Sequence, residues 1–325
     1  MVLTPPISPM LARPRDTLPP ASQMPDAFWQ QKVDGYRVLA FIRSGALHLQ
    51  SRGGANLTAA FPELAAAARD VREDLVVDGE LVVFAGGRLD FVALQQRARR
   101  TGRSAAEAAR SAPAHVVAFD LLEADGDAWL DRPYSERWSR LEAAFSSGAL
   151  RTPWTLVACT RDRKVAMEWL DPAYGRVGVE GVMIKPGTGL YRPGYRGWWK
   201  VRSFQSAEGI VAGVTGPVSG PHSLLLGRYD SAGRLRFVAR TTPLTAAARR
   251  DLGALLVPGG SEHPWAGVRI SAGWGSREDL RFVTVRPELV VEVRTDSAVE
   301  QGRHRHPVRY LRVRDDLAPH EVRAL

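Results

Sequence analysis

The sequence is poor in two residue types that carry chemistry. Cys159 is the only cysteine among 325 residues, which excludes an intrachain disulfide and a zinc site made of several cysteines. Only four lysines occur, and the remaining 40 of the 44 basic residues are arginine. For surface charge arginine serves about as well as lysine, but its guanidinium stays protonated, whereas a lysine amine can lose its proton and act as a nucleophile. Each lysine is therefore a candidate for chemistry: Lys32, Lys164, Lys185 and Lys200.

Long apolar runs are also missing. No stretch approaches the roughly 20 apolar residues that a membrane-spanning helix needs. The proline-punctuated residues 1–28 lack the apolar core of a signal peptide. Together with the single cysteine, which fits a reducing compartment, these absences predict a cytoplasmic protein without a membrane partner.

Positive charge, in contrast, is in excess. The formal net charge is +9 and the isoelectric point about 10.2, which favours a polyanionic partner, above all nucleic acid. The alternative is a compositional bias toward arginine and alanine, which the alanine-rich stretches 65–68 and 105–109 support. The hydrophobic fraction of 45% is enough for folded cores, and the length fits one large domain or two ordinary ones.

Strand-like and helix-like segments alternate up to about residue 203. Helical spacing of apolar residues occurs over 61–71 and 135–145. Four apolar runs are typical of strands: 38–43, 75–84, 115–122 and 179–185. The mixture predicts an α+β domain of mixed sheets and helices.

The pattern changes near residue 205. Short strands separated by turns predominate from residue 208 onward, and one helix is predicted over 244–256. About five strands and one helix are typical of a small β-barrel of the oligonucleotide-binding class, the OB-fold. We therefore predict two domains, residues 1–204 and residues 205–325.

Two short segments contain three of the four lysines. The first, KVDGYR (32–37), has the form K-x-D-G-x-R; the alternative is a polar turn in which Gly35 supplies backbone freedom. The second, residues 180–202, starts with EGVMIK and ends with WWKVR. Strict strand alternation predicts that Glu180, Val182 and Ile184 share one face and that Lys185 lies on the other. The alternative for this segment is an edge strand with solvated ends.

These segments resemble the covalent nucleotidyltransferase superfamily, which comprises ATP-dependent DNA ligases, RNA ligases and mRNA capping enzymes. SPMLARP (8–14) and RPELVVEV (286–293) are most similar to the short actinobacterial type called ligase C and to the ligase domain of bacterial ligase D. Five further segments match in the family's order: SRGGANLT (51–58), LVVDGELVVF (75–84), AFDLLEADG (118–126), RPYSERWSRLE (132–142) and RHPVRYLRVRDD (305–316). The resemblance covers nearly the whole chain. It implies an adenylation (nucleotidyltransferase) domain followed by the OB-fold domain.

The resemblance also implies the cofactor and the roles of individual residues. Lys32 is expected to attack ATP and carry AMP, Phe119 to stack on adenine, and Glu80 to contact the ribose. Glu180 is expected to hold Mg²⁺ or Mn²⁺, for which a carboxylate is a suitable ligand. Asp120 is a second candidate metal ligand, with a structural carboxylate as the alternative. Contacts to the nucleotide or to phosphates are expected from Gln30, Arg37, Arg52, Lys185, Lys200 and Arg314.

For several of these residues, an ordinary structural or solvated role is the alternative. Glu80 and Phe119 can be structural, and Arg52 can be a solvated loop arginine. Relatives often have an acidic residue where this chain has Gln30, and many have a lysine where it has Leu317.

The implied chemistry consists of three in-line attacks at phosphorus, which depend on alignment and charge neutralisation. Lys32 has to be neutral to attack, and we expect the neighbouring cations to lower its pKa.

The sequence thus predicts an ATP-dependent DNA ligase that seals nicks in duplex DNA during repair. From the resemblance alone, the expected partners are the end-binding protein Ku and a repair polymerase or primase, and the expected place is the nucleoid. Two alternatives stay open. One is an RNA ligase or capping-type guanylyltransferase, and the other is a non-catalytic nucleic-acid-binding protein of the same fold.

Overall fold

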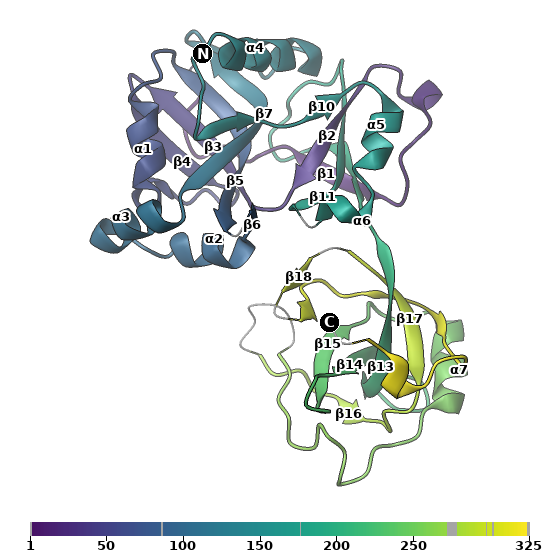
Figure 1. Ribbon diagram of the computed structural model, residues 1–325. Coiled ribbons are helices and arrows are strands. Elements are labelled where there is room, and N and C mark those ends of the chain that lie inside the picture. The colour runs from purple at the N-terminus through teal and green to yellow at the C-terminus, as the bar shows by residue number, and fades with distance from the viewer. Residues whose placement is uncertain are drawn as a thin grey trace. The chain divides into compact units, whose positions relative to one another are not determined.

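The computed structural model describes residues 2–85, 87–175, 177–271, 278–296, 298–300 and 302–323. The chain divides into two units, Met1–Ser203 and Phe204–Leu325, which are described separately (Figure 1). No helix in these described ranges is both long and apolar enough to cross a membrane.

The smaller sheet of the first unit has the strand order β1-β12-β11-β2-β10. Its strands are β1 (Leu11–Arg15), β2 (Ala27–Val33), β10 (Cys159–Thr160), β11 (Val179–Pro186) and β12 (Arg196–Arg202). β11 runs antiparallel to both β2 and β12, with Gly181 opposite Lys32 and Met183 opposite both Gln30 and Lys200. The segments that carry Lys32, Lys185 and Lys200 are therefore adjacent strands.

The larger sheet of this unit has the order β4-β3-β5-β7-β8, with β6 paired to β5 and β9 to β7. Its strands are β3 (Tyr36–Arg43), β4 (Ala46–Ser51), β5 (Leu75–Ala85), β6 (Arg88–Leu89), β7 (Ala114–Ala124), β8 (Asp127–Ala128) and β9 (Trp154–Leu156). Along β3, Val38 and Ala40 belong to one buried cluster, and Leu39 and Phe41 to another. Both faces of β3 are thus covered, which explains its continuous apolar sequence.

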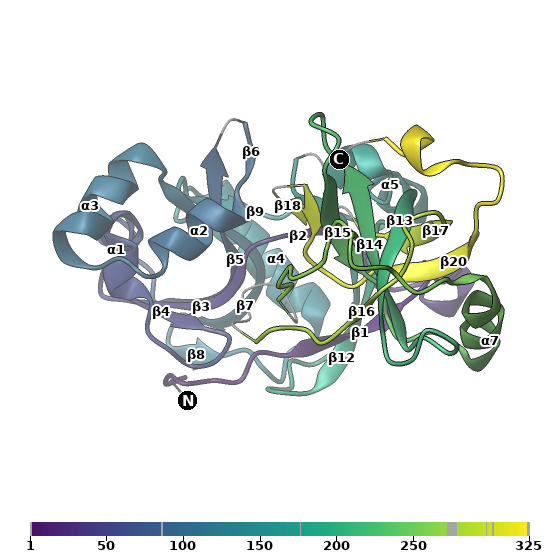
Figure 2. The same ribbon diagram turned by 90° about the horizontal axis from the view of Figure 1, so that it is seen from below.

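Helices cover the larger sheet, and two short ones lie by the smaller sheet. Leu64 of α1, Leu94 of α2 and Leu141 of α4 are buried in the same core as the larger sheet, and Figures 1 and 2 show α1, α2 and α3 grouped on one side of the unit. Asp90 and Asp162 cap α2 and α5 by accepting backbone hydrogen bonds. The helices are α1 (Pro62–Ala68), α2 (Phe91–Arg97), α3 (Gly102–Ser111), α4 (Tyr134–Ser146), α5 (Arg163–Glu168) and α6 (Pro172–Gly175).

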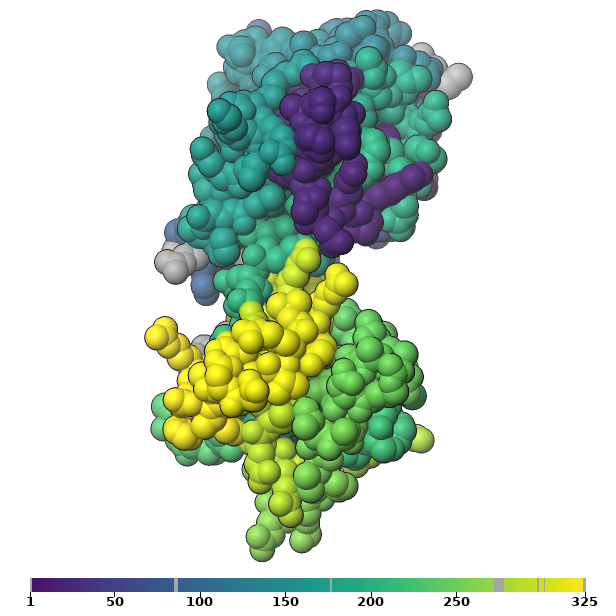
Figure 3. Space-filling model, turned by 90° about the vertical axis from the view of Figure 1, so that its right-hand side faces the viewer, coloured from purple at the N-terminus to yellow at the C-terminus, as the bar shows by residue number. Residues whose placement is uncertain are grey.

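The N-terminal segment lies on the surface of the first unit (Figure 3). The backbone N–H and C=O of Ile7 bond to the side chain of Gln50 at 2.8 and 2.7 Å, and the N–H of Met10 donates to the Tyr191 hydroxyl at 3.0 Å. These bonds lead the chain into β1, which lies beside β12. The segment therefore contributes to a wall of the cavity described below.

The second unit is a closed barrel. Its sheet has the order β15-β14-β13-β17-β20, and a parallel bridge between Thr241 and Val308 joins the two ends. A helix, α7 (Ala246–Leu255), lies between β15 and β17 in sequence and buries Leu252 in the barrel core. The barrel strands are β13 (Gln205–Thr215), β14 (Ser223–Tyr229), β15 (Leu235–Arg240), β17 (Val290–Thr295) and β20 (Arg309–Val313). Shorter pieces are β16 (Val283–Thr284), β18 (Val299–Glu300) and β19 (Arg303–His304).

The predicted fold class, an α+β unit followed by a small OB-fold barrel, is confirmed. The predicted strands and the helices α1, α4 and α7 occur where expected. The helices α2 and α3 were not predicted, because residues 91–111 are rich in arginine and alanine and have few large apolar residues to mark a helical period.

Candidate active site

Strands of both sheets line one cavity of the first unit. β2, β11 and β12 contribute from the smaller sheet, and β3, β5 and β7 from the larger one. The predicted site residues that line it are Gln30, Lys32, Arg37, Arg52, Glu80, Phe119, Lys185 and Lys200. Three of the four lysines therefore share one cavity, whereas Lys164 lies on α5.

Lys32 is held by a carboxylate. Its Nζ donates a hydrogen bond to Glu180. Burial lowers the pKa of Lys32, but the carboxylates of Glu180, Glu80 and Asp34 outweigh burial, so the pKa is raised. The expectation that neighbouring cations lower the pKa of Lys32 is wrong for this arrangement, because carboxylates dominate around Nζ. Lys32 is therefore a protonated amine paired with Glu180.

A β-bulge brings Glu180 to Lys32. The register of β11 on β2 shifts between Val179 and Gly181, which makes Glu180 the extra residue of β11. Gly181 has a φ of +145°, and a Cβ atom there would lie 2.1 Å from the carbonyl oxygen of Val201. Only glycine fits this position, which explains why glycine follows the glutamate.

The bulge also corrects the predicted strand alternation. Val182 and Ile184 pack together in the buried cluster of the smaller sheet, and Lys185 lines the cavity, as alternation predicts. Glu180 does not share the face of Val182 and Ile184, because it reaches Lys32 at the cavity. An extra residue at the bulge reverses the direction of the side chain that precedes it.

Arg37 is fixed by a buried carboxylate. It donates two hydrogen bonds to Asp78, which is fully buried and also accepts one from the Tyr191 hydroxyl at 2.7 Å. The guanidinium lies 4.6 Å from the ring centroid of Phe119 and 5.2 Å from that of Trp198. Asp78 and Tyr191 were not predicted as site residues, because an acidic residue in a strand gives no sign of which distant residue it contacts.

Lys185 lies in a cage of aromatic rings. Its Nζ is 4.6, 4.6 and 4.2 Å from the ring centroids of Phe119, Tyr134 and Trp198, and donates to the Phe119 carbonyl at 2.7 Å. Burial lowers the pKa of Lys185 to about 8, against the opposing effect of Asp120. A desolvated ammonium over several rings is a strong cation–π arrangement. It ties β11 to β7 at the cavity.

Two other cavity residues, Glu80 and Lys200, have shifted pKa values. Burial raises the pKa of Glu80 to about 7, although Lys32 and Arg37 pull it down. Burial lowers the pKa of Lys200, and the nearby Arg202, Lys32 and Arg52 lower it further. Perturbed groups of this kind gather at functional sites. The cavity thus combines a carboxyl group that is poised near neutral pH with several close cations.

Asp120 does not fit its predicted role as a metal ligand. It is fully buried, and its two oxygens accept hydrogen bonds from Arg137 at 2.8 and 3.1 Å. Lys185 lies 3.6 Å away as a second cation. A carboxylate already neutralised on both oxygens is not available to a metal ion, so Asp120 is the structural carboxylate of the alternative interpretation.

Replacing Asp120 is therefore expected to cost stability. Asp120→Asn leaves the buried guanidinium of Arg137 without its counter-ion, which is expected to lower the free energy of unfolding by about 3–5 kcal/mol. Denaturant unfolding measures this loss. Asp125→Asn is the matched control, because the Asp125 side chain is 65% exposed and pairs only at the surface with Arg140. A fully stable Asp120→Asn protein whose activity returns at high Mg²⁺ would contradict the structural assignment.

The remaining predicted site residue lies in the second unit. Arg314 pairs there with Asp316 at 2.8 Å and with Glu208 at 3.1 Å. Its implied role toward ATP stays a prediction. Among the residues that the structure describes, no group of three or more His, Cys, Asp or Glu is arranged to hold a metal ion.

The chain is similar to known proteins over nearly its whole length. The model of the ATP-dependent DNA ligase domain matches residues 9–202, and that of the ATP-dependent DNA ligase C-terminal region matches residues 219–317. DNA ligase C of Mycobacterium tuberculosis is 36% identical over 97% of this chain and 92% of its own length. The multifunctional non-homologous end joining DNA repair protein LigD of M. tuberculosis is 32% identical over 90% of this chain and 37% of its own length.

Solved structures of ligase domains are also similar to this chain. The ligase domain of M. tuberculosis LigD is 29% identical, with a TM-score of 0.52 and 98% of both chains covered. A mycobacterial DNA ligase D in complex with ATP and MES gives a TM-score of 0.53 at the same identity and coverage. The resemblance inferred from the ordered motifs is confirmed: this chain belongs to the ATP-dependent DNA ligase family.

Proposed function

We propose that this chain seals nicks in duplex DNA with ATP, through an AMP that becomes covalently attached to Lys32. The observation that carries most weight is that three of the four lysines line one cavity in a chain that otherwise uses arginine for positive charge. A cation needed only for charge can be arginine, whereas an attacking amine cannot. Two of the three, Lys32 and Lys185, are also embedded in networks of buried partners.

The first reaction is an attack by Lys32 Nζ on the α-phosphorus of ATP, with pyrophosphate as the leaving group. Nζ has to lose its proton before it attacks, and the hydrogen bond to Glu180 holds the amine in place until then. Lys200, whose pKa is lowered by burial and by nearby cations that include Arg52, would gain from the negative charge of the triphosphate. Alignment and charge neutralisation supply most of the rate enhancement in such transfers.

The adenosine part of ATP is proposed to occupy the inner end of the cavity. Phe119 offers its ring for stacking on the base, with the Arg37 guanidinium 4.6 Å from its centroid. Glu80 is proposed to contact the ribose. With a pKa of about 7, its carboxyl group can either donate to or accept from a hydroxyl near neutral pH.

Glu180 is the residue that would hold Mg²⁺ or Mn²⁺. A single carboxylate ligand that is paired with Lys32 in the absence of nucleotide fits such an ion, since magnesium is often bound through one or two carboxylates together with substrate phosphates and water. When bound, the ion supplies neutralisation of phosphate charge.

The second and third reactions involve DNA. AMP passes from Lys32 to the 5′-phosphate of the nick, and the 3′-hydroxyl then attacks that phosphate and expels AMP. Arg52 is proposed to bind the 5′-phosphate, because it lies on the exposed turn after β4 and still lines the cavity. A guanidinium presents a fork of donors that suits phosphate.

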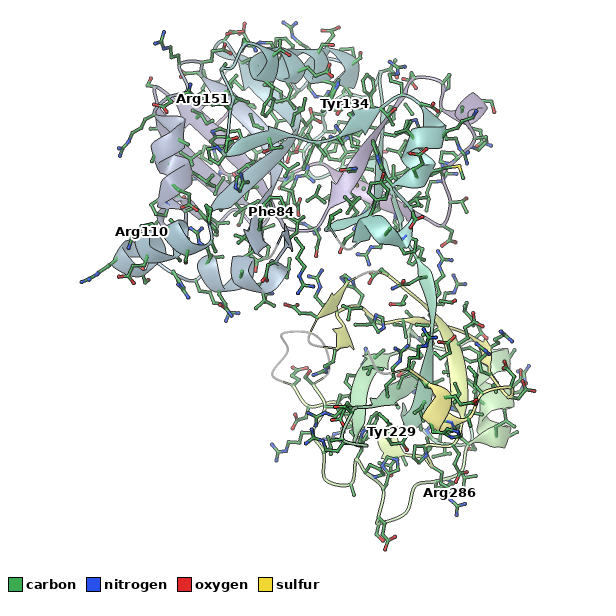
Figure 4. All side chains as sticks on the ribbon, viewed as in Figure 1. Phe84, Arg110, Tyr134, Arg151, Tyr229 and Arg286 are labelled. Atoms are coloured by element: carbon green, nitrogen blue, oxygen red, sulfur yellow. The ribbon has the colours of Figure 1, made fainter. Side chains whose placement is uncertain are left out.

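Arg52→Ala is expected to separate these reactions. Loss of one charged hydrogen-bonding group is expected to slow nick sealing about 10–100-fold, while Lys32 still takes up AMP. Single-turnover sealing and label uptake from α-labelled ATP measure the two effects. Arg110→Ala, which changes an outward-pointing arginine of α3 (Figure 4), is the matched control. Loss of AMP uptake in Arg52→Ala would place this arginine in the first reaction instead.

The pathway is a further part of the proposal. Relatives named as end-joining repair proteins suggest that the nicks arise at double-strand breaks, with Ku and a repair polymerase or primase as partners at the nucleoid. Family membership favours a DNA ligase over the RNA ligase, guanylyltransferase and non-catalytic alternatives.

The test combines sealing and mass analysis. The purified chain is incubated with ATP, and the peptide that contains Lys32 is examined for a mass gain of one AMP. Nicked DNA, nicked RNA and GTP are then supplied in parallel. Sealing of DNA from ATP supports the proposal, whereas an adduct from GTP alone or the absence of any adduct contradicts it.

A further inference from the structure

A hydrogen-bond network fixes the orientation of a buried amide in the cavity. Gln30 lines the cavity and is 1% exposed. Its side-chain nitrogen lies 2.6 Å from the Tyr134 hydroxyl oxygen and 3.3 Å from the Phe119 carbonyl oxygen. The Cys159 thiol is a further hydrogen-bonding neighbour of this amide, and the side-chain oxygen, which can accept two hydrogen bonds, accepts none from the other residues that the structure describes. The amide thus uses one end within the protein and leaves the other for a ligand.

The two neighbours, Phe119 and Tyr134, determine which end of the Gln30 amide is the nitrogen and which is the oxygen. The Phe119 carbonyl can only accept, so the atom 3.3 Å from it has to be the amide nitrogen. The Tyr134 hydroxyl lies 3.1 Å from the same carbonyl and gives its proton to it. The hydroxyl oxygen is then the acceptor for Gln30. Burial raises the pKa of Tyr134 well above its ordinary value, so this proton stays in place.

Turning the amide over would undo this network. An oxygen in place of the nitrogen would face the Phe119 carbonyl oxygen at 3.3 Å, and Tyr134 would have to turn its proton from Phe119 to Gln30. Each buried hydrogen bond lost corresponds to about a tenfold shift in an equilibrium. The Tyr134 ring itself cannot move aside, because it packs edge-on against Phe28 at 5.1 Å and below the Lys185 ammonium.

We infer that Tyr134, acting with the Phe119 carbonyl, is a positioning residue that selects adenine over guanine. It holds the Gln30 side-chain oxygen toward the nucleotide as a hydrogen-bond acceptor. Adenine carries an exocyclic amine that donates to such an oxygen, whereas guanine carries a carbonyl at the same ring position, which an acceptor repels. This inference rests on the proposed function, because it assumes that the cavity receives the base of ATP.

Without this fixed orientation of Gln30, the selection of adenine over guanine would be weak. A freely turning amide offers either a donor or an acceptor and therefore reads both purines. A site discriminates strongly when the mismatched ligand leaves a buried polar group without a partner. Gln30 meets that condition only while Tyr134 and Phe119 prevent it from turning.

The test compares labelled adduct formation from α-labelled ATP and from α-labelled GTP in the full chain. Tyr134→Phe keeps the ring and removes the hydroxyl, and the ratio of the two rates is expected to fall about tenfold, the equivalent of one buried hydrogen bond. The same substitution is made in a Gln30→Glu background. Both ends of a carboxylate accept, so orientation no longer matters there, and Tyr134→Phe is expected to leave the ratio of that background unchanged.

Tyr174→Phe, in the partly buried α6, is the matched control. An unchanged ratio in Tyr134→Phe, or an equal fall in both backgrounds, would overturn the inference, because the second result is what a merely structural tyrosine gives. If Tyr134→Phe fails to fold, Gln30→Met replaces it, and the wild-type ratio in that variant would equally overturn the inference. Absence of any adduct in the wild-type chain would instead reject the proposed function.

Discussion

Lys32→Arg is expected to abolish covalent attachment of AMP while the protein remains folded. The substitution keeps the positive charge, and the guanidinium can still pair with Glu180, which accepts a hydrogen bond from Lys32 Nζ in the wild-type chain. It removes the lone pair that attacks phosphorus, because a guanidinium stays protonated at neutral pH. Label uptake from α-labelled ATP is expected to fall at least about 1,000-fold, as is usual when a nucleophile is lost. Sealing of a nick that already carries AMP is expected to persist, since Lys32 no longer attacks there.

Two other lysines provide the comparison. Lys164 lies on α5, away from the cavity, so Lys164→Arg is expected to take up label like the wild type. Lys200→Arg is expected to be intermediate, because a phosphate contact tolerates a different cation better than an attack does. Uptake of label by Lys32→Arg near the wild-type level would overturn the proposed mechanism. Loss of label in Lys164→Arg would show that the substitution itself disturbs the chain.

The clustering of Lys32, Lys185 and Lys200 could be predicted from the sequence. Lysine is rare in this chain, which singled out these three residues, and the ordered motifs implied that they lie in one site. The fold class followed from period and composition, since long apolar strands and a later series of short strands leave clear patterns.

Other properties of the site depend on distant partners that the sequence does not reveal. Asp120 is a structural carboxylate because Arg137, from the following helix, takes both its oxygens. The pKa of Lys32 is raised because Glu180, 148 residues later, reaches it. Tyr134 lies inside the segment RPYSERWSRLE (132–142), but nothing in that segment indicates that its hydroxyl contacts Gln30.

The bulge at Glu180 is the clearest case. Period-two reasoning fails there because it assumes an unbroken ladder, and one extra residue changes the direction of a side chain. The sequence does hold a signal, since glycine directly after a functional glutamate in a strand is costly unless the backbone requires it. That requirement can be tested directly.

Gly181→Ala is expected to disable the site without touching any of its side chains. The added Cβ atom would lie 2.1 Å from the carbonyl oxygen of Val201 and 2.8 Å from the Cα of Arg202. Both are backbone atoms of β12, the strand that carries Lys200, so they cannot swing aside as a flexible side chain does. The φ of +145° is also unfavourable for alanine, at a cost of about 1–3 kcal/mol.

Relief of this clash has to move β11 or β12, and either movement displaces Glu180 from Lys32 or Lys200 from the cavity. A displacement of about 1 Å is enough to slow an aligned reaction about 100-fold. We therefore expect AMP uptake by Gly181→Ala to fall at least about that much, with a lower melting temperature. Gly260→Ala is the matched control, because a Cβ atom there meets nothing within 4 Å. A Gly181→Ala protein that takes up AMP at the wild-type rate would show that the bulge does not set the geometry of attack.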